Sequence, residues 1–416
     1  MLDINFIRKN QELVEKSARE KGYSVDINAL LTSDEERRKV LQEVEGMRQR
    51  RNEIASKMKG GKPDPELIAE GKKVKETLSV AEDRLSELET EVRSVLKTVP
   101  NVITDDVPLG GEECSVEVDA WGGKKPASEG VDHLDYALSR DWVDFERGAA
   151  VAGNKFYYLK GGLALLEQAL IQYGINKVTE KGFTLMTVPD LVSSKVLEGT
   201  GFNPRSSAQS DEYFVEGEDM ALIATAEIPL TGYHMNEIID ESRLPLLYSG
   251  LSACFRKEAG SAGKHTRGLF RVHQFNKLEM YVFCVPEKSP EMHEMILEIE
   301  KEIWQELGIP YHVINIAAGD LGAPAAKKYD VEYWSPVDQC YREITSCSNC
   351  TDFQARNLNI RVRRTDGTIE VLHTLNGTAI SLARTMVAVI ENYATAGGKL
   401  RIPEALRPYL GGKTEL

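Results

Sequence analysis

The chain lacks the segments that would place it in or across a membrane. None of the apolar runs in its 416 residues approaches the roughly 18 consecutive residues that a membrane-spanning helix needs. The opening segment, MLDINFIRKNQELVEKS, carries acidic residues and has no apolar core of the kind found in signal peptides. We therefore expect a cytoplasmic protein with no membrane partner.

Cysteines are also few. Six in a chain of this length give no paired framework, so free thiols in a reducing compartment are expected; they are Cys114, Cys254, Cys284, Cys340, Cys347 and Cys350. Cys347 and Cys350 form a CxxC pair, but structural zinc needs four ligands and the chain has no second pair. We therefore expect buried or half-buried thiols here and no zinc.

The glycine motifs of the common nucleotide-binding folds are missing as well. Neither the P-loop nor the Rossmann fingerprint occurs in the sequence, so any ATP chemistry must use another scaffold. The net charge of -14 argues against a protein that coats polyanions along its whole surface. The length favours two domains rather than one.

A helical hairpin is predicted near the amino terminus. Apolar residues recur every three or four positions between Val40 and Met58, with an interruption at Arg51, and again between Val74 and Val95, which is the seam of a coiled coil. GGKPDP, from Gly60 to Pro65, breaks the helix between them. The sequence therefore predicts an antiparallel coiled-coil arm from about Asp34 to Leu96.

Positive charge gathers in the distal half of this arm. Between Arg48 and Lys75 there are nine basic residues against four acidic ones, a local net charge of +5, whereas the base of the arm is acid-rich. Such a patch on an acidic protein indicates a polyanion contact, although solvated lysines remain the alternative. The basic residues are Arg48, Arg50, Arg51, Lys57, Lys59, Lys62, Lys72, Lys73 and Lys75.

Charged residues also interrupt two strand-like runs between Leu251 and Phe283. A two-residue period puts Arg271, Phe275 and Glu279 on one face of the second run, with His273 and Lys277, and leaves Phe270 and Val272 on the other. Arg256 ends the first run with its guanidinium free to grip a phosphate or carboxylate. We interpret the segment as a nucleotide cradle; the alternative is a solvated hairpin whose charges pair across strands.

This segment, FRKEAGSAGKHTRGLFRVHQFNKLE, resembles motif 2 of the class II aminoacyl-tRNA synthetases in the form found in the seryl-tRNA synthetase family. Four further strings match the family in the same order: KGFTLMTVPDLV resembles motif 1, TAE begins at Thr225, YREITSCSN begins at Tyr341, and LNGTAISLARTMVAVIENY resembles motif 3. The first hundred residues resemble the family's helical arm. The resemblance therefore spans essentially the whole chain.

The resemblance implies an α+β fold, with a class II antiparallel sheet flanked by helices and an N-terminal coiled-coil arm. It places a tRNA-binding helical domain at residues 1–105 and a catalytic domain at 106–416. The helix at Gly162–Lys177 and the strand TLMTVP after it would form a homodimer interface; a plain core helix is the alternative. His265 and His273 lie near the motif 2 loop, and we expect them to have structural roles.

The implied activity is ATP-dependent conversion of L-serine to seryl-adenylate, followed by transfer of serine to the 3′ end of tRNA(Ser), and also of tRNA(Sec). Arg256 and Arg384 are the catalytic candidates. The resemblance assigns ATP binding to Arg256, Lys257, Glu258, Val272, Phe275, Glu343, Ile344, Thr345, Ser346 and Arg384. Glu343 and Ser346 would also hold Mg²⁺, which requires a bulge near Thr345, because residues three apart in a regular strand face opposite sides.

The resemblance assigns serine binding to Thr225, Ala226, Glu227, Arg256, Glu279 and Thr378. Glu279 is the candidate that binds the ammonium and hydroxyl groups of serine. The resemblance assigns tRNA binding to the nine basic residues of the arm. Two other functions stay open: a related ligase that loads a carrier protein, and a coiled-coil binding protein with a decayed synthetase core. The basic arm argues against the first, and the intact Arg256, Glu279, Glu343 and Arg384 argue against the second.

Overall fold

The computed structural model describes residues 1–416 except 59–63, 203–210, 259–266 and 396. The chain divides into two compact units, Met1–Pro100 and Asn101–Leu416. Within the described ranges, no helix is both long enough and apolar enough to cross a membrane. All six cysteines lie in these ranges and all are free, as predicted.

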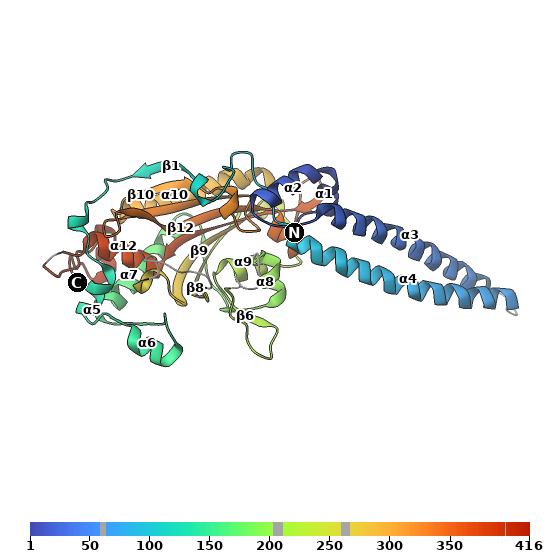
Figure 1. Cartoon of the computed structure of the whole chain (residues 1–416), viewed down its shortest axis with the longest axis horizontal. Helices are drawn as coiled ribbons and strands as arrows, with labels where there is room; N and C mark the ends of the chain where they lie inside the picture. The colour runs from blue at the N-terminus through green and yellow to red at the C-terminus, as the bar shows by residue number, and fades with distance from the viewer. Residues whose placement is uncertain (59–63, 203–210, 259–266, 396) are drawn as a thin grey trace. The chain divides into compact units, whose positions relative to one another are not determined.

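The first unit is helical. Two short helices, α1 (Ile4–Lys9) and α2 (Gln11–Glu20), precede two long ones, α3 (Ile27–Met58) and α4 (Pro65–Thr98). The long helices lie side by side as a hairpin (Figure 1), and the 32 residues of α3 correspond to about 48 Å at 1.5 Å per residue. Their shared seam contains the buried Val44, Ile54, Leu78 and Leu85, so the predicted coiled-coil arm is confirmed.

The hairpin begins earlier than the sequence pattern indicated. We expected its first leg to start near Asp34, but α3 starts at Ile27. Ile27 and Leu30 are buried and extend the helix toward the amino terminus. Asp34 is buried too and pairs with Arg8 and Arg37, so it anchors the base of the arm instead of adding solvated negative charge there.

An eight-stranded sheet forms the centre of the second unit. All neighbouring strands are antiparallel except the edge pair β4 and β8, which is parallel. This matches the expected α+β class. In spatial order the strands are β1 (Val116–Trp121), β10 (Tyr311–Asn315), β11 (Lys327–Ser335), β12 (Cys340–Thr351), β15 (His373–Ser381), β9 (Gln274–Cys284), β8 (Leu246–Phe255) and β4 (Thr184–Thr187).

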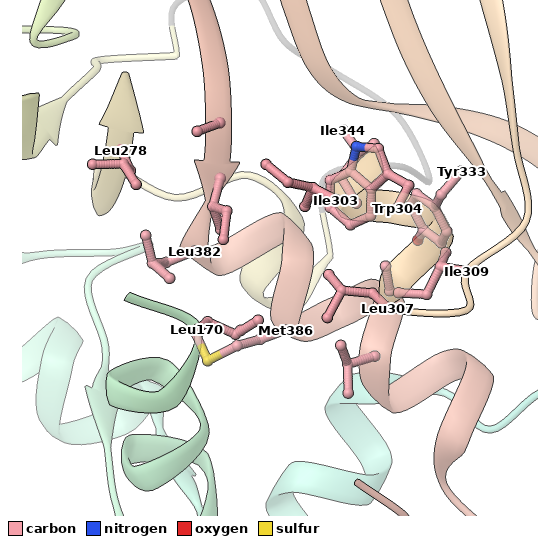
Figure 2. Packing of buried hydrophobic residues seen from close by; sticks show 14 of the residues in the cluster. Leu170, Leu278, Ile303, Trp304, Leu307, Ile309, Tyr333, Ile344, Leu382 and Met386 are labelled. Atoms are coloured by element: carbon pink, nitrogen blue, oxygen red, sulfur yellow. The ribbon is translucent and has the colours of Figure 1, made fainter. Parts of the chain in front are cut away.

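Three long helices share one hydrophobic core with this sheet: α7 (Gly161–Glu180), α10 (Ser289–Glu306) and α12 (Leu382–Tyr393). Figure 2 shows the packing, with Leu170 of α7, Met386 of α12 and Trp304 of α10 among its side chains. The predicted helix and strand at 162–189 are therefore confirmed as α7 and β4. α7 buries one face in the core, while Leu165 on it stays 49 % exposed.

Smaller elements complete the unit. Among the residues that the structure describes, three minor sheets contain β2 (Val143–Asp144) with β3 (Tyr158–Leu159), β5 (Leu191–Ser193) with β6 (Met220–Leu222), and β14 (Ile369–Val371) with β13 (Arg361–Arg363) and β7 (Ile238–Asp240). The short helices are α5 (His133–Ser139), α6 (Phe145–Ala152), α8 (Ser194–Thr200), α9 (Glu227–Gly232) and α11 (Phe353–Asn357).

Two neighbouring strands in the middle of the sheet carry bulges. In β12, Thr345 pairs with Val331 and Glu343 pairs with Glu332, so Ile344 is an extra residue. In β15, the pairing with β9 shifts between Thr378 and Ile380. Each bulge changes which side chains share a face of the sheet, and both occur beside the cavity described next.

Candidate active site

A cavity of about 220 Å³ lies over the central strands. Both the loop between β8 and β9 and the start of α12 contribute to its wall, together with β9, β11, β12 and β15. Its lining residues are Arg256, Glu258, Phe270, Arg271, Val272, Phe275, Lys277, Lys328, Glu343, Ile344, Thr345, Ser346, Thr378, Ser381, Ala383 and Arg384. The structure thus brings together predicted residues from motifs that are more than a hundred positions apart.

The face assignment for the second strand-like run was partly wrong. We placed Phe270 and Val272 on the face opposite Arg271 and Phe275, but all four line the cavity. The cause is that β9 begins only at Gln274, and residues 268–270 form a 3₁₀ turn instead of a strand. The two-residue alternation therefore does not apply before Gln274.

Arg256 stands where β8 ends. Its backbone N–H donates to His273 O at 3.0 Å, and its guanidinium lies 5.4 Å from the centre of the Phe275 ring. His273 in turn faces Arg256 O at 2.9 Å and packs near Phe156 and Tyr213, which fits the structural role expected for it. His265 lies outside the described residues. A cation and an aromatic face therefore border one side of the cavity.

Glu258 and Lys257 differ in position. Glu258 lines the cavity in a left-handed backbone conformation (φ 52°) and pairs with Arg271 at 2.6 Å. Lys257 is exposed and its ammonium lies 5.6 Å from the centre of the Tyr213 ring. The structure therefore brings Glu258 to the cavity, while Lys257 is not among the residues that line it.

Arg384 adds a second predicted guanidinium group to the lining of the cavity. Arg384, in the first turn of α12, pairs with the Glu343 carboxylate at 3.2 Å and lies 5.0 Å from the Phe270 ring centre. Burial would raise the pKa of Glu343, but the charges of Arg384 and Lys328 outweigh it and hold the pKa at about 2. Glu343 is therefore ionised at neutral pH, while 41 % of its side chain remains exposed.

The bulge required for the magnesium prediction is present. Ile344 is the extra residue, and both Glu343 and Ser346 line the cavity in spite of their three-residue spacing. Ionised carboxylate and hydroxyl oxygens are hard donors of the kind that Mg²⁺ prefers. Asp330 lies opposite Ser346 in the strand pair and meets Lys328 at 3.0 Å. Glu343 and Ser346 therefore fit a magnesium ion that takes its remaining ligands from a phosphate group and water.

A second group of carboxylates is buried next to the cavity. Glu279 is almost fully buried and pairs at 2.5 Å with Lys277, which lines the cavity wall. Burial raises the pKa of Glu279, against the lowering effect of Lys277 and Arg256. Thr225, Ala226 and Glu227 are buried in the same region. These predicted serine-binding residues form a buried cluster beside Lys277, which we name the pocket.

Glu227 is the less compensated of the two acids. It begins α9 and is 7 % exposed. Burial is the main cause of its pKa of about 7, the nearby Glu279 raises it further, and Gln354, Lys277 and Arg256 act in the opposite direction. The pocket therefore places two carboxyl groups near Lys277 and Arg256, and burial disfavours the ionised form of both acids. A positively charged ligand bound here would favour their ionised forms.

Sequence reasoning assigned no role to several lining residues. Lys277 was visible in the alternating pattern of the second run, but the resemblance gave it no function. Lys328 lies on β11 and Ser381 at the start of α12, and neither belongs to a charged pattern that could be read from the sequence. Phe270 was hidden by the wrong strand boundary. Of these lining residues, only Lys277 could have been identified from the sequence pattern.

The basic residues of the arm fall into two groups. Arg48 pairs with Glu82 at 2.7 Å, and Arg50 pairs with Glu70 at 2.8 Å, so both link α3 to α4. Arg51, Lys57, Lys72, Lys73 and Lys75 are all exposed. Lys59 and Lys62 lie outside the described residues. The first two arginines therefore have a structural task that the sequence did not reveal.

Comparisons with known proteins cover the same regions. Residues 1–103 match the family model for the seryl-tRNA synthetase N-terminal domain, and residues 213–393 match that for the tRNA synthetase class II core domain (G, H, P, S and T). A serine–tRNA ligase of Dictyoglomus turgidum is 45 % identical, covering 99 % of this chain and 98 % of that protein. One of Treponema denticola is 44 % identical and covers 99 % of both.

Solved structures agree with these matches. Seryl-tRNA synthetase from Pyrococcus horikoshii, crystallised with ATP, superposes with a TM-score of 0.91 at 41 % identity and covers 100 % of this chain and 99 % of that one. The cytoplasmic serine–tRNA ligase of Naegleria fowleri in complex with AMP gives a TM-score of 0.86 at 32 % identity, covering 100 % and 98 %. The similarity thus includes the arm as well as the catalytic unit.

Proposed function

The chain belongs to the seryl-tRNA synthetase family, and we propose from this premise that it activates L-serine with ATP and transfers the serine to the 3′ end of tRNA(Ser). It is a serine–tRNA ligase of class II, and ATP is its nucleotide substrate. The observation that carries the residue assignment is the arrangement of two cavity arginines, Arg256 and Arg384, beside a buried pocket with two carboxyl groups.

The first half-reaction joins two anions, so cations have to bring them together. The serine carboxylate attacks the α-phosphate of ATP, and pyrophosphate leaves. Arg256 binds the α-phosphate and the serine carboxylate, because its planar fork can meet oxygens of both groups. Arg384 binds the γ-phosphate near the start of α12, where the helix end also favours negative charge.

The remaining cavity residues hold the nucleotide. Phe275 stacks on the adenine and Glu258 accepts a hydrogen bond from it, while Val272 and the 343–346 segment of β12 close the wall. Glu343 and Ser346 would hold Mg²⁺, which would neutralise part of the phosphate charge. Arg384 pairs with the Glu343 carboxylate, so the γ-phosphate and the magnesium ion would compete with this pair for the two side chains. Lys257, which is exposed and does not line the cavity, would contact the nucleotide only from the surface.

Serine binds in the pocket next to Arg256. Glu279 and Glu227 receive its ammonium and hydroxyl groups, with Thr225, Ala226 and Thr378 around them. A site that hydrogen-bonds the hydroxyl rejects alanine, because alanine would leave buried polar groups unpaired. Glu227 and Glu279 lie close enough to affect each other's charge, which supports a shared cationic ligand.

The arm binds tRNA. Double-stranded RNA is recognised mainly by shape and backbone, which suits exposed cations on a narrow hairpin. We assign this contact to Arg51, Lys57, Lys72, Lys73 and Lys75, with Lys59 and Lys62 of the connecting segment. Arg48 and Arg50 support it by joining the two helices. We propose tRNA(Ser) and also tRNA(Sec) as the acceptors, a homodimer formed through α7 and β4, and a cytoplasmic location.

The deciding experiment is charging of total tRNA with labelled serine. Alanine, threonine, cysteine and glycine are run beside it, with the full-length chain and with a variant that lacks residues 34–96. Charging with serine alone, lost when the arm is removed, supports the proposal. Charging of no amino acid would contradict it and favour a carrier-loading ligase or an inactive core. Purified tRNA(Ser) and tRNA(Sec) then separate the two acceptors.

A further inference from the structure

A fully buried glutamine connects the proposed serine pocket to the end of a neighbouring helix. Gln354 lies in α11, just after β12, and is 0 % exposed. Its Nε2 donates to Glu227 Oε1 at 2.7 Å and to Thr200 O at 3.0 Å. Its Oε1 accepts from Tyr281 Oη at 2.9 Å and from Thr374 Oγ1 at 2.8 Å. All four hydrogen-bonding positions of the amide are thus used.

The orientation of this amide is determined by chemistry. A backbone carbonyl only accepts hydrogen bonds, so the atom that faces Thr200 O must be the nitrogen. The second hydrogen of that nitrogen then faces Glu227. Turning the amide over would set an oxygen against both Thr200 O and the Glu227 carboxylate, in a place where buried acceptors cannot find water. Gln354 therefore faces Glu227 with a hydrogen-bond donor and not with an acceptor.

Asn376 supports the same carboxylate from the sheet. Its Nδ2, on β15, donates to Glu227 Oε1 at 3.1 Å. Two amide donors from separate elements therefore meet one oxygen of Glu227. A ligand that binds this group must use the other oxygen, so the direction from which it can be approached is restricted.

The two amide donors, from Gln354 and Asn376, are neutral, so they do not cancel the charge of Glu227. A lysine at either position would hold Glu227 equally well, but it would also cancel its charge. Amides orient the carboxylate and leave its charge available to a cationic ligand. Glu279 is different, since Lys277 already pairs with it.

We propose that Gln354 is a positioning residue for amino acid recognition, which orients Glu227 toward serine through this buried network. The inference rests on the proposed function, because it takes Glu227 as a serine ligand. It adds a residue outside the class II motifs, from the segment TDFQARN that follows the CxxC pair. The prediction is a defect in serine use that leaves nucleotide use nearly unchanged.

A matched control is available on the same helix. Asn357 also belongs to α11, and its Nδ2 donates to Gly199 O at 2.8 Å. Both side chains thus tie α11 to the last turn of α8, but only Gln354 reaches Glu227. If Gln354 merely anchored α11, the two substitutions would have similar effects.

The experiment is serine-dependent ATP–pyrophosphate exchange with the full-length chain and three variants: Gln354→Leu, Gln354→Glu and Asn357→Leu. For both Gln354 variants we expect the KM for serine to rise roughly ten- to a hundredfold, as for the loss of a hydrogen bond to a charged group, with the KM for ATP within about twofold. Asn357→Leu should leave the KM for serine within about twofold.

Gln354→Glu keeps the shape of the side chain and gives a second readout. At low pH its carboxyl group can share a proton with Glu227, whereas at high pH the two repel each other. The KM for serine of this variant should therefore rise between pH 6 and pH 8. If Gln354→Leu fails to fold, this variant decides the outcome.

Three results would overturn the inference. One is an unchanged serine KM in a folded Gln354 variant, and another is an equal defect in Asn357→Leu. The third is a parallel rise in the KM values of serine and ATP. In all three the wild-type chain still exchanges pyrophosphate with serine, so the proposed function survives. A wild-type chain without serine-dependent exchange would overturn the proposed function and this inference with it.

Discussion

The main cavity and the buried pocket beside it use the same strands but balance their charges differently. In the cavity each carboxylate has a cation: Arg271 pairs with Glu258 and Arg384 pairs with Glu343. In the pocket Lys277 pairs with Glu279, and burial raises the pKa of both Glu227 and Glu279. The cavity can therefore exchange its internal pairs for contacts with an anionic ligand, whereas the two acids of the pocket would be favoured in their ionised form by a bound cation such as an ammonium group.

The largest effect should come from Arg256, which borders both regions. In Arg256→Ala we expect kcat/KM for serine-dependent pyrophosphate exchange to fall roughly a thousandfold, because a charge-stabilising donor to the reacting groups is lost. Steady-state exchange assays measure it. Arg267→Ala is the control, since Arg267 is 54 % exposed and pairs with Asp132 and Asp135. Near-normal turnover in Arg256→Ala would contradict the role of Arg256 in joining the two substrates.

Glu279 tests the pocket alone. Removing the whole side chain would leave Lys277 buried without its partner, which costs about 3–5 kcal/mol in such pairs, so Glu279→Gln is the better variant. We expect its KM for serine to rise about a hundredfold while the KM for ATP changes little. Substrate titrations of pyrophosphate exchange separate the two. Equal changes in both would mean that the pocket and the cavity are one site.

The pH dependence of serine binding tests whether the ionised form of Glu227 binds the ammonium group. Glu227 has a pKa of about 7, so its ionised fraction, and with it the affinity for an ammonium group, rises between pH 6 and pH 8. We expect the KM for serine to fall roughly tenfold over this range. Glu279, Lys277, Arg256 and Tyr281 surround the group, so Glu227→Gln, which should show a flatter profile, is measured beside it.

Protein stability should change in the opposite direction. The raised pKa of Glu227 means that the folded chain holds a proton that the unfolded chain has released between pH 4.5 and 7. This group therefore makes the free energy of unfolding fall as the pH rises through that window. Denaturant titrations of the wild type and of Glu227→Gln measure the difference. A smaller slope in the variant is expected, and equal slopes would contradict the assignment.

The smallest effects should occur on the arm, where charges face water. The triple variant Lys72→Ala, Lys73→Ala and Lys75→Ala should raise the KM for tRNA about three- to tenfold and make it less sensitive to salt. Serine activation without tRNA should not change. Arg50→Ala is the contrast, since it breaks an exposed link between helices worth about 1 kcal/mol or less. A defect in serine activation from the lysine variant would mean that the arm does more than bind tRNA.

The sequence was most informative where one pattern had one structural solution. The seam from Val44 to Leu85 could only pack as a hairpin, and the spacing of Glu343 and Ser346 demanded the bulge that Ile344 supplies. It was less informative where contacts come from distant segments. Arg50 is a predicted RNA ligand, and its sequence pattern gave no sign that it also pairs with Glu70. No local pattern connects Gln354 with Glu227, 127 positions away. The 3₁₀ turn before Gln274 replaced an alternation that seemed regular.

The extra residue at Ile344 also limits how this strand can change during evolution. Side chains along β12 can be exchanged one at a time, but a one-residue insertion or deletion would turn every later side chain to the opposite face. Glu343 and Ser346 would then separate, and Cys347 would leave the core. We therefore expect β12 to diverge by substitution and to keep its length, so that homologous chains should align through it without gaps.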